Sequence, residues 1–312
     1  MFDVRKLRVR LHEISKTTFI PSKLGIFNFM AGSVLNASLS IIGAGKVGRT
    51  LAKLWADNGV FRLQDMLCQS QKNADSATGF VGSGRAVSDY AALLPADIYL
   101  IATSDDRIES SCEELTRRGL ISASTIVFHC SGALASSILH TATQQGAAVA
   151  SIHPIRSFAN PEQVAKDFTG TWCGMEGDQR ALDILSPAFE AIGAKTANIR
   201  TDAKIHYHAG AVFASNYLVT LLDIAVQSYA RAGIASDTAL DMMAPLVRET
   251  VQNVFRLGPE TALTGPVARG DMATANKQWQ AVAAADATHG RLYEQLMQLT
   301  VELAARRKPP EK

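Results

Sequence analysis

The sequence feature that most constrains the fold is a Gly-x-Gly-x-x-Gly motif formed by Gly43, Gly45 and Gly48. A short apolar run precedes the motif, and an amphipathic helical pattern follows it at once. In this context Gly43 permits a tight turn, Gly45 lets the backbone approach a pyrophosphate, and Gly48 lets the new helix pack closely on the strand. The backbone N–H groups of Lys46 and Val47 lie at the positive end of that helix. The motif therefore predicts dinucleotide binding, although a strand-turn-helix without a ligand gives a similar pattern.

The end of the second predicted strand, residues 63–69, indicates which dinucleotide is favoured. A cofactor without a 2′-phosphate usually meets an Asp or Glu about 20 residues beyond the motif, and none occurs there. Ser70 and Lys72 could instead contact the extra phosphate, with Lys72 acting as a point charge. The sequence therefore favours NADP over NAD. The alternative is that Lys72 is a solvated surface charge.

Strands alternate with helices from residue 37 to residue 158, which predicts a doubly wound, mostly parallel α/β sheet. Ligands of such sheets lie beyond the carboxyl ends of the strands. Polar residues at predicted strand ends that we expect to contact the cofactor are Thr103, Ser104, His129 and Ser131. The candidate substrate contacts His153, Arg156 and Ser157 follow the strand 147–152. Arg156 could clamp a carboxylate or phosphate through two hydrogen bonds, or could form an interdomain salt bridge.

Changes of pattern divide the chain into segments. Residues 1–36 are rich in Lys and Arg, and we expect a poorly ordered N-terminal extension there. Residues 37–160 are predicted to form the dinucleotide-binding domain and residues 161–306 a C-terminal substrate and dimerisation domain. Within the latter, 161–202 contains two strand patterns that could extend the sheet, and long helical patterns dominate 203–306, the first over 203–232. The tail 307–312 is expected to fray.

Five stretches resemble one known family in their order and spacing. They are GAGKVG at 43–48, HCSGA at 129–133, HPIRSF at 153–158, YHAGAVFASNYLV at 207–219 and ALTGPVARGD at 262–271. This family has a Rossmann-like N-terminal domain and a helical C-terminal domain of unknown function, and its members are described as NADP-dependent oxidoreductases. The resemblance implies a Rossmann-like doubly wound sheet followed by an all-α domain like the C-terminal domain of 6-phosphogluconate dehydrogenase. More distantly, the architecture is similar to ketopantoate reductase, pyrroline-5-carboxylate reductase and prephenate dehydrogenase. The resemblance supplies no substrate.

The first long helical pattern carries the candidate catalytic residues, His208 and Asn216. Helical spacing puts Lys204, His208 and Ser215 on one stripe, with Asn216 roughly 80° around from it. His208 could protonate a carbonyl or imine as hydride arrives, or it could be a capping or core histidine. Ser215 is a candidate substrate contact, whereas Tyr207 is interpreted as packing.

A polar loop between two later helices contains Arg269 and Asp271. Arg269 is a candidate contact for the substrate or for a partner subunit. Asp271 is expected to cap the helix that begins near Met272.

Composition excludes several other classes of protein. Apolar residues make up 47% of the chain and charged residues 19%, with a net charge of +2 and 7% aromatics. These values fit a globular protein and give no argument for nucleic acid binding. The four cysteines form no metal-ligand pattern, so we expect no metal and a reduced, cytoplasmic protein. The most apolar helical pattern, 209–226, is interrupted by polar residues and is a poor membrane span. Related folds dimerise through the helical lobe, so by analogy a homodimer is expected.

Two functions follow from these patterns. The first is an NADP-dependent oxidoreductase that transfers hydride between a nicotinamide cofactor and a small, anionic oxo or imino substrate. The second is a non-catalytic NADP-binding sensor or regulatory protein on a dehydrogenase-derived fold. The chain lacks the Lys-x-x-x-Asn pattern of hydroxyacid dehydrogenases on its first long helix, which leaves the second hypothesis open.

Overall fold

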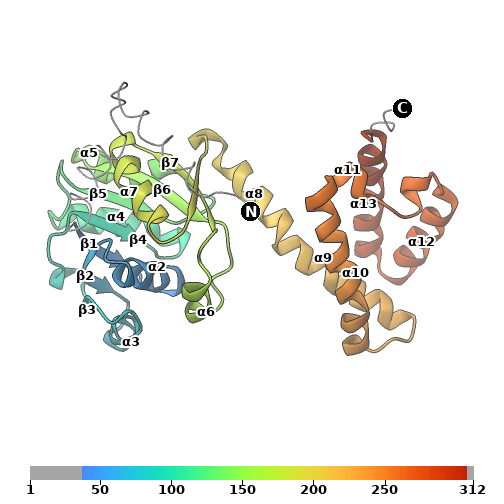
Figure 1. Ribbon diagram of the computed structural model, residues 1–312, viewed down its shortest axis with the longest axis horizontal. Coiled ribbons are helices and arrows are strands. Elements are labelled where there is room, and N and C mark those ends of the chain that lie inside the picture. Colours follow the sequence, from blue (N-terminus) through green and yellow to red (C-terminus); the bar gives the residue numbers. More distant parts are fainter. Residues whose placement is uncertain (1–36, 308–312) are drawn as a thin grey trace, which may run out of the picture. The chain divides into compact units, whose positions relative to one another are not determined.

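The computed structural model describes residues 37–307 and divides the chain into two compact units, one ending at Gly210 and the other beginning at Ala211. Predictions for residues 1–36 and for the tail from residue 308 lie outside the described residues. The first unit is built on one eight-stranded sheet, and the described part of the second unit is helical (Figure 1). The predicted fold class, a doubly wound and mostly parallel sheet followed by a helical region, is confirmed.

The sheet has the strand order β3-β2-β1-β4-β5-β6-β7-β8. All neighbouring strands are parallel except β6 and β7, which are antiparallel. The strands are β1 (Ser38–Ile42), β2 (Arg62–Leu67), β3 (Arg85–Val87), β4 (Ile98–Ile101), β5 (Ile126–His129), β6 (Ala148–Pro154), β7 (Trp172–Gly177) and β8 (Lys195–Asn198). The short β3 was not apparent from the sequence, because three residues give too little periodicity to recognise.

Helices cover both faces of this sheet (Figure 1). The α-helices of the first unit are α2 (Lys46–Asp57), α3 (Gln71–Val81), α4 (Ile108–Arg117), α5 (His140–Gln144), α6 (Pro161–Lys166) and α7 (Gln179–Glu190). Short 3₁₀ turns are η2 (Tyr90–Ala92), η3 (Asp105–Arg107), η4 (Ser136–Leu139) and η5 (Thr201–Ala203). Two buried clusters follow from the alternation of side chains along the strands, one on each face of the sheet.

Trp55 of α2 lies at the centre of the larger cluster. Its ring makes edge-to-face contacts with Phe61, Phe128 and Phe189, and its Nε1–H donates to the carbonyl oxygen of Ala188 at 3.0 Å. Because the ring is fully buried and its one polar atom is paired, it fixes α2 firmly on the sheet.

The helix α8 (Lys204–Ala214) begins in the first unit and continues past its end. The second unit also contains α9 (Asn216–Arg231), α10 (Ser236–Leu257), α11 (Pro259–Ala262), η6 (Val267–Arg269), α12 (Met272–Ala285) and α13 (Ala287–Ala305). The single helix predicted over 203–232 is interrupted at Ser215, where φ is −124° and ψ is −70°, outside the helical region.

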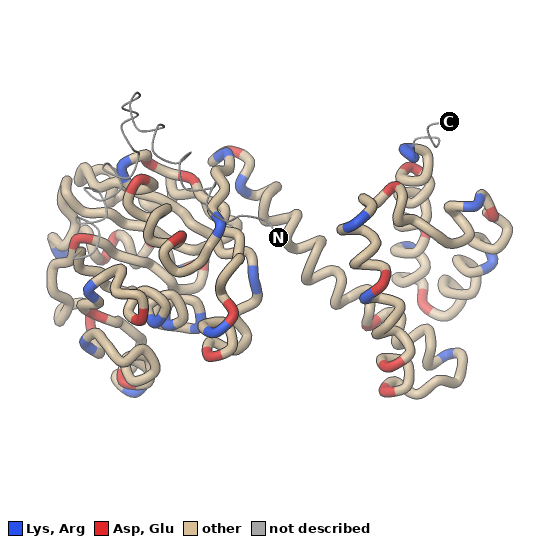
Figure 2. Tube along the Cα trace, in the orientation of Figure 1, with Lys and Arg blue, Asp and Glu red and all other residues tan. Residues whose placement is uncertain are grey.

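The second unit buries few side chains. Among its described residues the buried ones are Ala239, Met243, Ala275 and Gly290. Its largest exposed apolar side chains are Phe213, Val219, Leu246, Phe255 and Leu299, each at least 58% exposed. Charged positions are sparse along α9, which carries Asp223 and Arg231 (Figure 2). Within the described residues, one helical stretch, Thr201–Arg231, has the length and composition to cross a membrane, which alone is weak evidence of a span.

Candidate functional site

The turn between β1 and α2 requires glycine at two positions. Gly43 has a φ of +88°, and a Cβ there would lie 2.8 Å from Cγ2 of Thr103. A Cβ on Gly48 would lie 2.8 Å from the carbonyl oxygen of Gly43 and 3.0 Å from Cγ2 of Ile41. These two glycines therefore serve the turn and the close packing of helix on strand that the motif predicts.

Gly45 differs from both of its neighbours in the motif. Its φ of −70° is open to any residue, and it is the N-cap of α2 without a side-chain capping bond. Apart from its own chain neighbours, no heavy atom lies within 4 Å of the position that a Cβ would take. Neither the backbone conformation nor the packing requires a glycine at this position. The effect of lacking a side chain here is to leave the space in front of the residue open.

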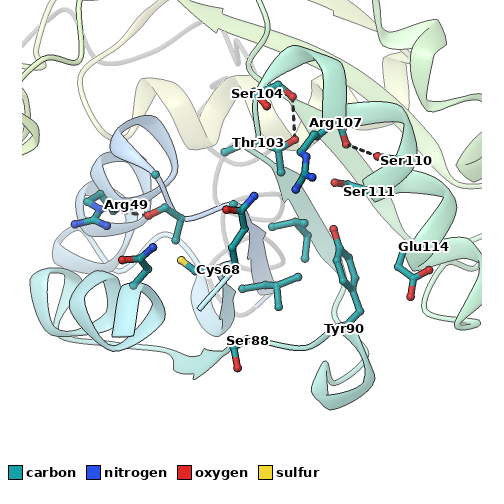
Figure 3. Close-up of a pocket in the computed structure, with 18 residues that line it drawn as sticks. Arg49, Cys68, Ser88, Tyr90, Thr103, Ser104, Arg107, Ser110, Ser111 and Glu114 are labelled. Atoms are coloured by element: carbon teal, nitrogen blue, oxygen red, sulfur yellow. Dashed lines mark hydrogen bonds between the residues drawn. The ribbon is translucent and has the colours of Figure 1, made fainter. Parts of the chain in front are cut away.

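That space belongs to a cavity of about 660 Å³ beyond the carboxyl ends of β1, β2 and β4 (Figure 3). Thr103 and Ser104, two of the predicted cofactor contacts, line it. The side chains of Lys46 and Val47 are not among its lining residues, although their backbone begins α2. The N-terminal N–H groups of a helix favour an anion.

The chain that follows β2 places Ser70 and Lys72 at the start of α3. Ser70 caps α3 by accepting a hydrogen bond from the Asn73 N–H at 3.3 Å, and Lys72 is exposed. Neither residue lines the cavity, whereas Arg49 and Asn73 do. The Arg49 side chain, labelled in Figure 3, donates through Nε to the carbonyl oxygen of Ala44 at 3.2 Å. A cation that lines the cavity therefore comes from α2, one residue after the glycine motif.

His129 is enclosed within the loop that follows β5. It is fully buried, its Nδ1 accepts a hydrogen bond from the Ser131 N–H at 3.1 Å, and its Nε2 lies 3.3 Å from the carbonyl oxygen of Ala135. Burial, and then the charge of Lys204, lower the pKa of His129 to about 4. The Ser131 hydroxyl donates to Asp105 at 2.8 Å. Both residues are thus engaged in shaping this loop.

Three residues on one face of α8 dock the start of that helix on the sheet. Lys204, Tyr207 and His208 stand at positions i, i+3 and i+4, which are neighbours on a helix surface. The interpretation of Tyr207 as packing alone is wrong, because its hydroxyl lies 3.1 Å from Nδ1 of His153. The Tyr207 ring occupies space that a side chain on Gly174 would fill, since a Cβ there would lie 2.5 Å from the hydroxyl.

The imidazole rings of His153 and His208 close over Gly132. Their centroids are 5.6 Å apart and their planes meet at 77°. A Cβ on Gly132 would overlap Nδ1 of His208 and lie 2.9 Å from Nε2 of His153. Burial, followed by the neighbouring His208 and Lys204, lowers the pKa of His153 to about 4. Nδ1 of His208 is buried and has no hydrogen-bond partner within the described residues.

Lys204 lies in a buried polar network at the base of this cluster. Its Nζ donates to the Ser151 hydroxyl and to Oε1 of Glu176, the latter at 3.3 Å. Both members of the ion pair are at most 2% exposed. Burial lowers the pKa of Lys204, and Glu176 opposes that effect. The sequence prediction of the site included neither residue.

Arg156 and Ser157 lie away from this cluster in their contacts. The Arg156 guanidinium pairs with Asp167 at 2.7 Å and donates to Thr171 at 3.3 Å, so its terminal nitrogens are engaged within the first unit. The Arg156–Asp167 pair thus crosses the domain boundary predicted at residue 160, but it lies within one compact unit of the structure. Ser157 is exposed.

The remaining candidates belong to the second unit. Ser215 stands at the interruption between α8 and α9, and Asn216 begins α9; both are exposed. Arg269 ends η6 and is exposed. Asp271 caps α12 by accepting a hydrogen bond from the Thr274 N–H at 3.1 Å, as predicted. No group of three or more His, Cys, Asp and Glu side chains in residues 37–307 could hold a metal ion.

Comparison with known proteins agrees with this arrangement. Residues 31–154 match the Rossmann-like domain family, and residues 171–300 match a domain of unknown function, DUF2520. The chain carries a Rossmann-like domain and a DUF2520 domain. The DUF2520 match includes β7, β8 and all three docking residues of α8. Among curated proteins, none matches the chain in sequence.

Solved structures resemble both domains together. A Thermotoga maritima protein is 25% identical with a TM-score of 0.70, covering 86% of this chain and 98% of its own. A candidate NADP oxidoreductase from Bacteroides fragilis is 22% identical with a TM-score of 0.66, covering 86% and 99%. An imine reductase from Streptomyces aurantiacus is 16% identical with a TM-score of 0.60, covering 86% and 95%. The Rossmann-like and DUF2520 domains together therefore have the fold of Rossmann-type oxidoreductases.

Proposed function

We propose that the protein is an NADP-dependent oxidoreductase whose cofactor binds in the cavity beside Gly45. The observation that carries this proposal is the open space in front of Gly45, at the uncapped start of α2. Backbone N–H groups at that helix start would hold the pyrophosphate. When bound, the nicotinamide supplies the hydride, so the protein has to orient the reactants and handle a proton.

Charge around the cavity supports NADP over NAD. Arg49 and Arg107 line it, and Figure 3 draws them on different walls. The one carboxylate among the lining residues, Glu114, is engaged by Arg117 and Arg118. A guanidinium binds a phosphate through parallel hydrogen bonds. We therefore assign Arg49, rather than Lys72, as the contact for the 2′-phosphate.

The cluster over Gly132 supports a proton-transfer role for His208. His153 has a pKa of about 4, so it is uncharged at neutral pH and can orient a substrate by hydrogen bonding. His208 presents the buried, unpartnered Nδ1 within the described residues, and it is the group that we assign to hold and donate the proton. Asn216, Ser215 and Arg269 are also proposed to contact the substrate.

The substrate is proposed to be a small, anionic oxo or imino compound. The similarity in fold to an imine reductase supports the imino class. The first test is calorimetric titration of the purified protein with NADPH and with NADH. Saturable binding with a preference for NADPH is expected; no binding of either would end the proposal.

The second test separates an enzyme from a sensor. Oxidation of NADPH is followed at its absorbance band with a panel of oxo acids and cyclic imines. His208→Ala should abolish any turnover while leaving NADPH binding intact. Binding of NADPH without turnover on the whole panel would favour the alternative, a non-catalytic NADP-binding sensor.

We further propose a homodimer formed through the helical unit. That unit buries four of its described residues and exposes large apolar side chains on α9, α10 and α13, and a second copy could cover such faces. Sedimentation equilibrium should give twice the chain mass, and Phe255→Asp should lower the mass towards that of a monomer. A monomeric wild-type protein at the highest soluble concentration would contradict this proposal.

A further inference from the structure

Glu176 joins the elements around the candidate site through one buried carboxylate. It stands in β7, opposite Ser151 of β6. Its Oε1 accepts from the Ser136 N–H at 2.7 Å, and its Oε2 accepts from the hydroxyls of Ser136 and Thr201 at 2.7 and 3.0 Å. With Lys204 as a further donor, the carboxylate links η4, η5, α8 and its own strand.

The arrangement costs free energy that an apolar pair would not cost. Removing two charges from water is offset only by good geometry and further hydrogen bonds, and apolar substitutes are often as stable. Here the hydrogen bonds are supplied from several elements of the fold. Stability alone therefore does not account for this pair.

The elements β6, η4 and α8, which lie around Glu176, also carry or adjoin the three residues of the Gly132 cluster. His153 follows Ser151 by two residues on β6, so both side chains leave the same face of the strand. His208 follows Lys204 by one helical turn on α8. Gly132 lies in the loop that ends at Ser136. A shift of the Lys204–Glu176 pair would therefore move His153, His208 and Gly132 relative to one another.

We propose that Glu176 and Lys204 are positioning residues, which hold His153 and His208 against Gly132 and keep a buried cation beneath the two imidazoles. The proposal deepens the proposed function, because His208 is the proton donor assigned there. Neither residue lines the cavity beside Gly45, so the pair acts on the proton-transfer groups and leaves cofactor binding alone.

The charged and titratable groups that act on the buried histidines His153 and His129 are few. His153 is influenced by His208 and Lys204, and Tyr207 contacts it. His129 is influenced by Lys204, Glu176 and Asp105. Lys204 lowers the pKa of both histidines, so its removal has a signed electrostatic consequence that a purely structural role would not give.

The test is an NMR titration of the protein labelled at the histidine Cε1 position, with each signal assigned by single histidine replacement. In Lys204→Met the pKa of His153 should rise, because the neighbouring cation is lost. The His208 signal should move at neutral pH in Lys204→Met and in Glu176→Gln. The matched control is Asp65→Asn, which alters another buried carboxylate, one paired with Arg85 at 2.8 Å and bound to the Leu94 N–H.

The outcomes distinguish this inference from the proposed function. An unchanged His153 titration and an unmoved His208 signal in both variants, or equal changes in Asp65→Asn, would overturn the positioning role. If Lys204→Met does not fold, Thr201→Ala, which removes one bond to Glu176, should still shift the His208 signal, and no shift would overturn the role. NADPH titration of the same variants should give the wild-type Kd. Absence of NADPH binding in the wild type counts against the proposed function and leaves the NMR result standing.

Discussion

Gly45 and Gly132 both stand at carboxyl ends of the sheet, and both lack a side chain for reasons unrelated to backbone freedom. Neither has a positive φ. A Cβ on Gly45 would meet no heavy atom beyond its chain neighbours, whereas a Cβ on Gly132 would collide with two imidazoles. The first glycine keeps a space open, and the second lets the protein's own side chains fill one. Substitutions at the two positions should therefore fail in different ways.

The largest effect should follow from Gly45→Val. Because its side chain would enter open space, the free energy of unfolding should fall only by the loss of a glycine N-cap, about 0.5–1 kcal/mol. NADPH binding should weaken by roughly 100-fold or more, which corresponds to about 2.8 kcal/mol. Urea unfolding and calorimetric titration measure the two quantities. The matched control is Gly48→Val, whose methyl groups would press on Gly43 and Ile41, and it should lose about 1–3 kcal/mol of stability. Full NADPH affinity in Gly45→Val would contradict the proposal that the cofactor binds beside Gly45.

Acid should destabilise the region around Gly132, where buried histidines lie. His129 and His153 have pKa values of about 4 in the folded protein, below the ordinary value of 6.5. The unfolded chain therefore binds protons more readily, so their contribution to stability is complete above pH 6.5 and is lost as the pH falls towards 4. The loss should approach 1.4 kcal/mol per pH unit for each histidine. Urea unfolding at a series of pH values measures it, and a flat profile from pH 7 to 4.5 would contradict the buried, uncharged state.

Gly132→Ala should disturb the packing of the two imidazoles over residue 132 without a change in backbone conformation. The new methyl group would displace the rings of His153 and His208, at a cost of about 1–3 kcal/mol in the free energy of unfolding. Gly79→Ala is the control, since Gly79 also lacks a positive φ, lies inside α3, and has nothing within 4 Å of a Cβ. That control should gain about 0.5–1 kcal/mol. Equal effects of the two substitutions would show that the imidazoles yield freely.

The smallest effect should come from Arg49→Met, in the cavity beside Gly45. Loss of one guanidinium–phosphate contact should weaken NADPH binding about tenfold, or 1.4 kcal/mol, and leave NADH binding unchanged. Lys72→Met is the control, because Lys72 does not line the cavity. If Lys72→Met lowers the NADPH affinity and Arg49→Met does not, Lys72 is the phosphate contact after all.

The turn at Gly45 could be predicted from the sequence because the residues that define it are close together in the chain. Three glycines within six residues, with a strand before and a helix after, define the turn without any distant contact. Ser70 is less informative as a cofactor signal, since a serine before a helix is also a good N-cap and serves as one here. Arg49 gave no separate signal, because a single arginine on a helix face is common.

The buried network beside Gly132 could not be predicted in the same way. The partners of Lys204 are Ser151 and Glu176, 53 and 28 residues away in the chain, and no local pattern brings them together. One signal was present: a glutamate within the otherwise apolar pattern of β7 requires a buried partner. Tyr207 was misjudged because a position three residues from Lys204 is only about 60° from it around the helix.

Trp55 gives each of these comparisons a built-in spectroscopic gauge. Its indole is fully buried among aromatic rings on α2, the helix capped by Gly45, while Trp279 lies half-buried on α12 of the second unit. The third tryptophan, Trp172 of β7, belongs to the first unit and is half-exposed. Replacing one indole at a time with phenylalanine would assign the emission of all three. Melting of the sheet and of the helical lobe could then be followed as separate events in one fluorescence experiment.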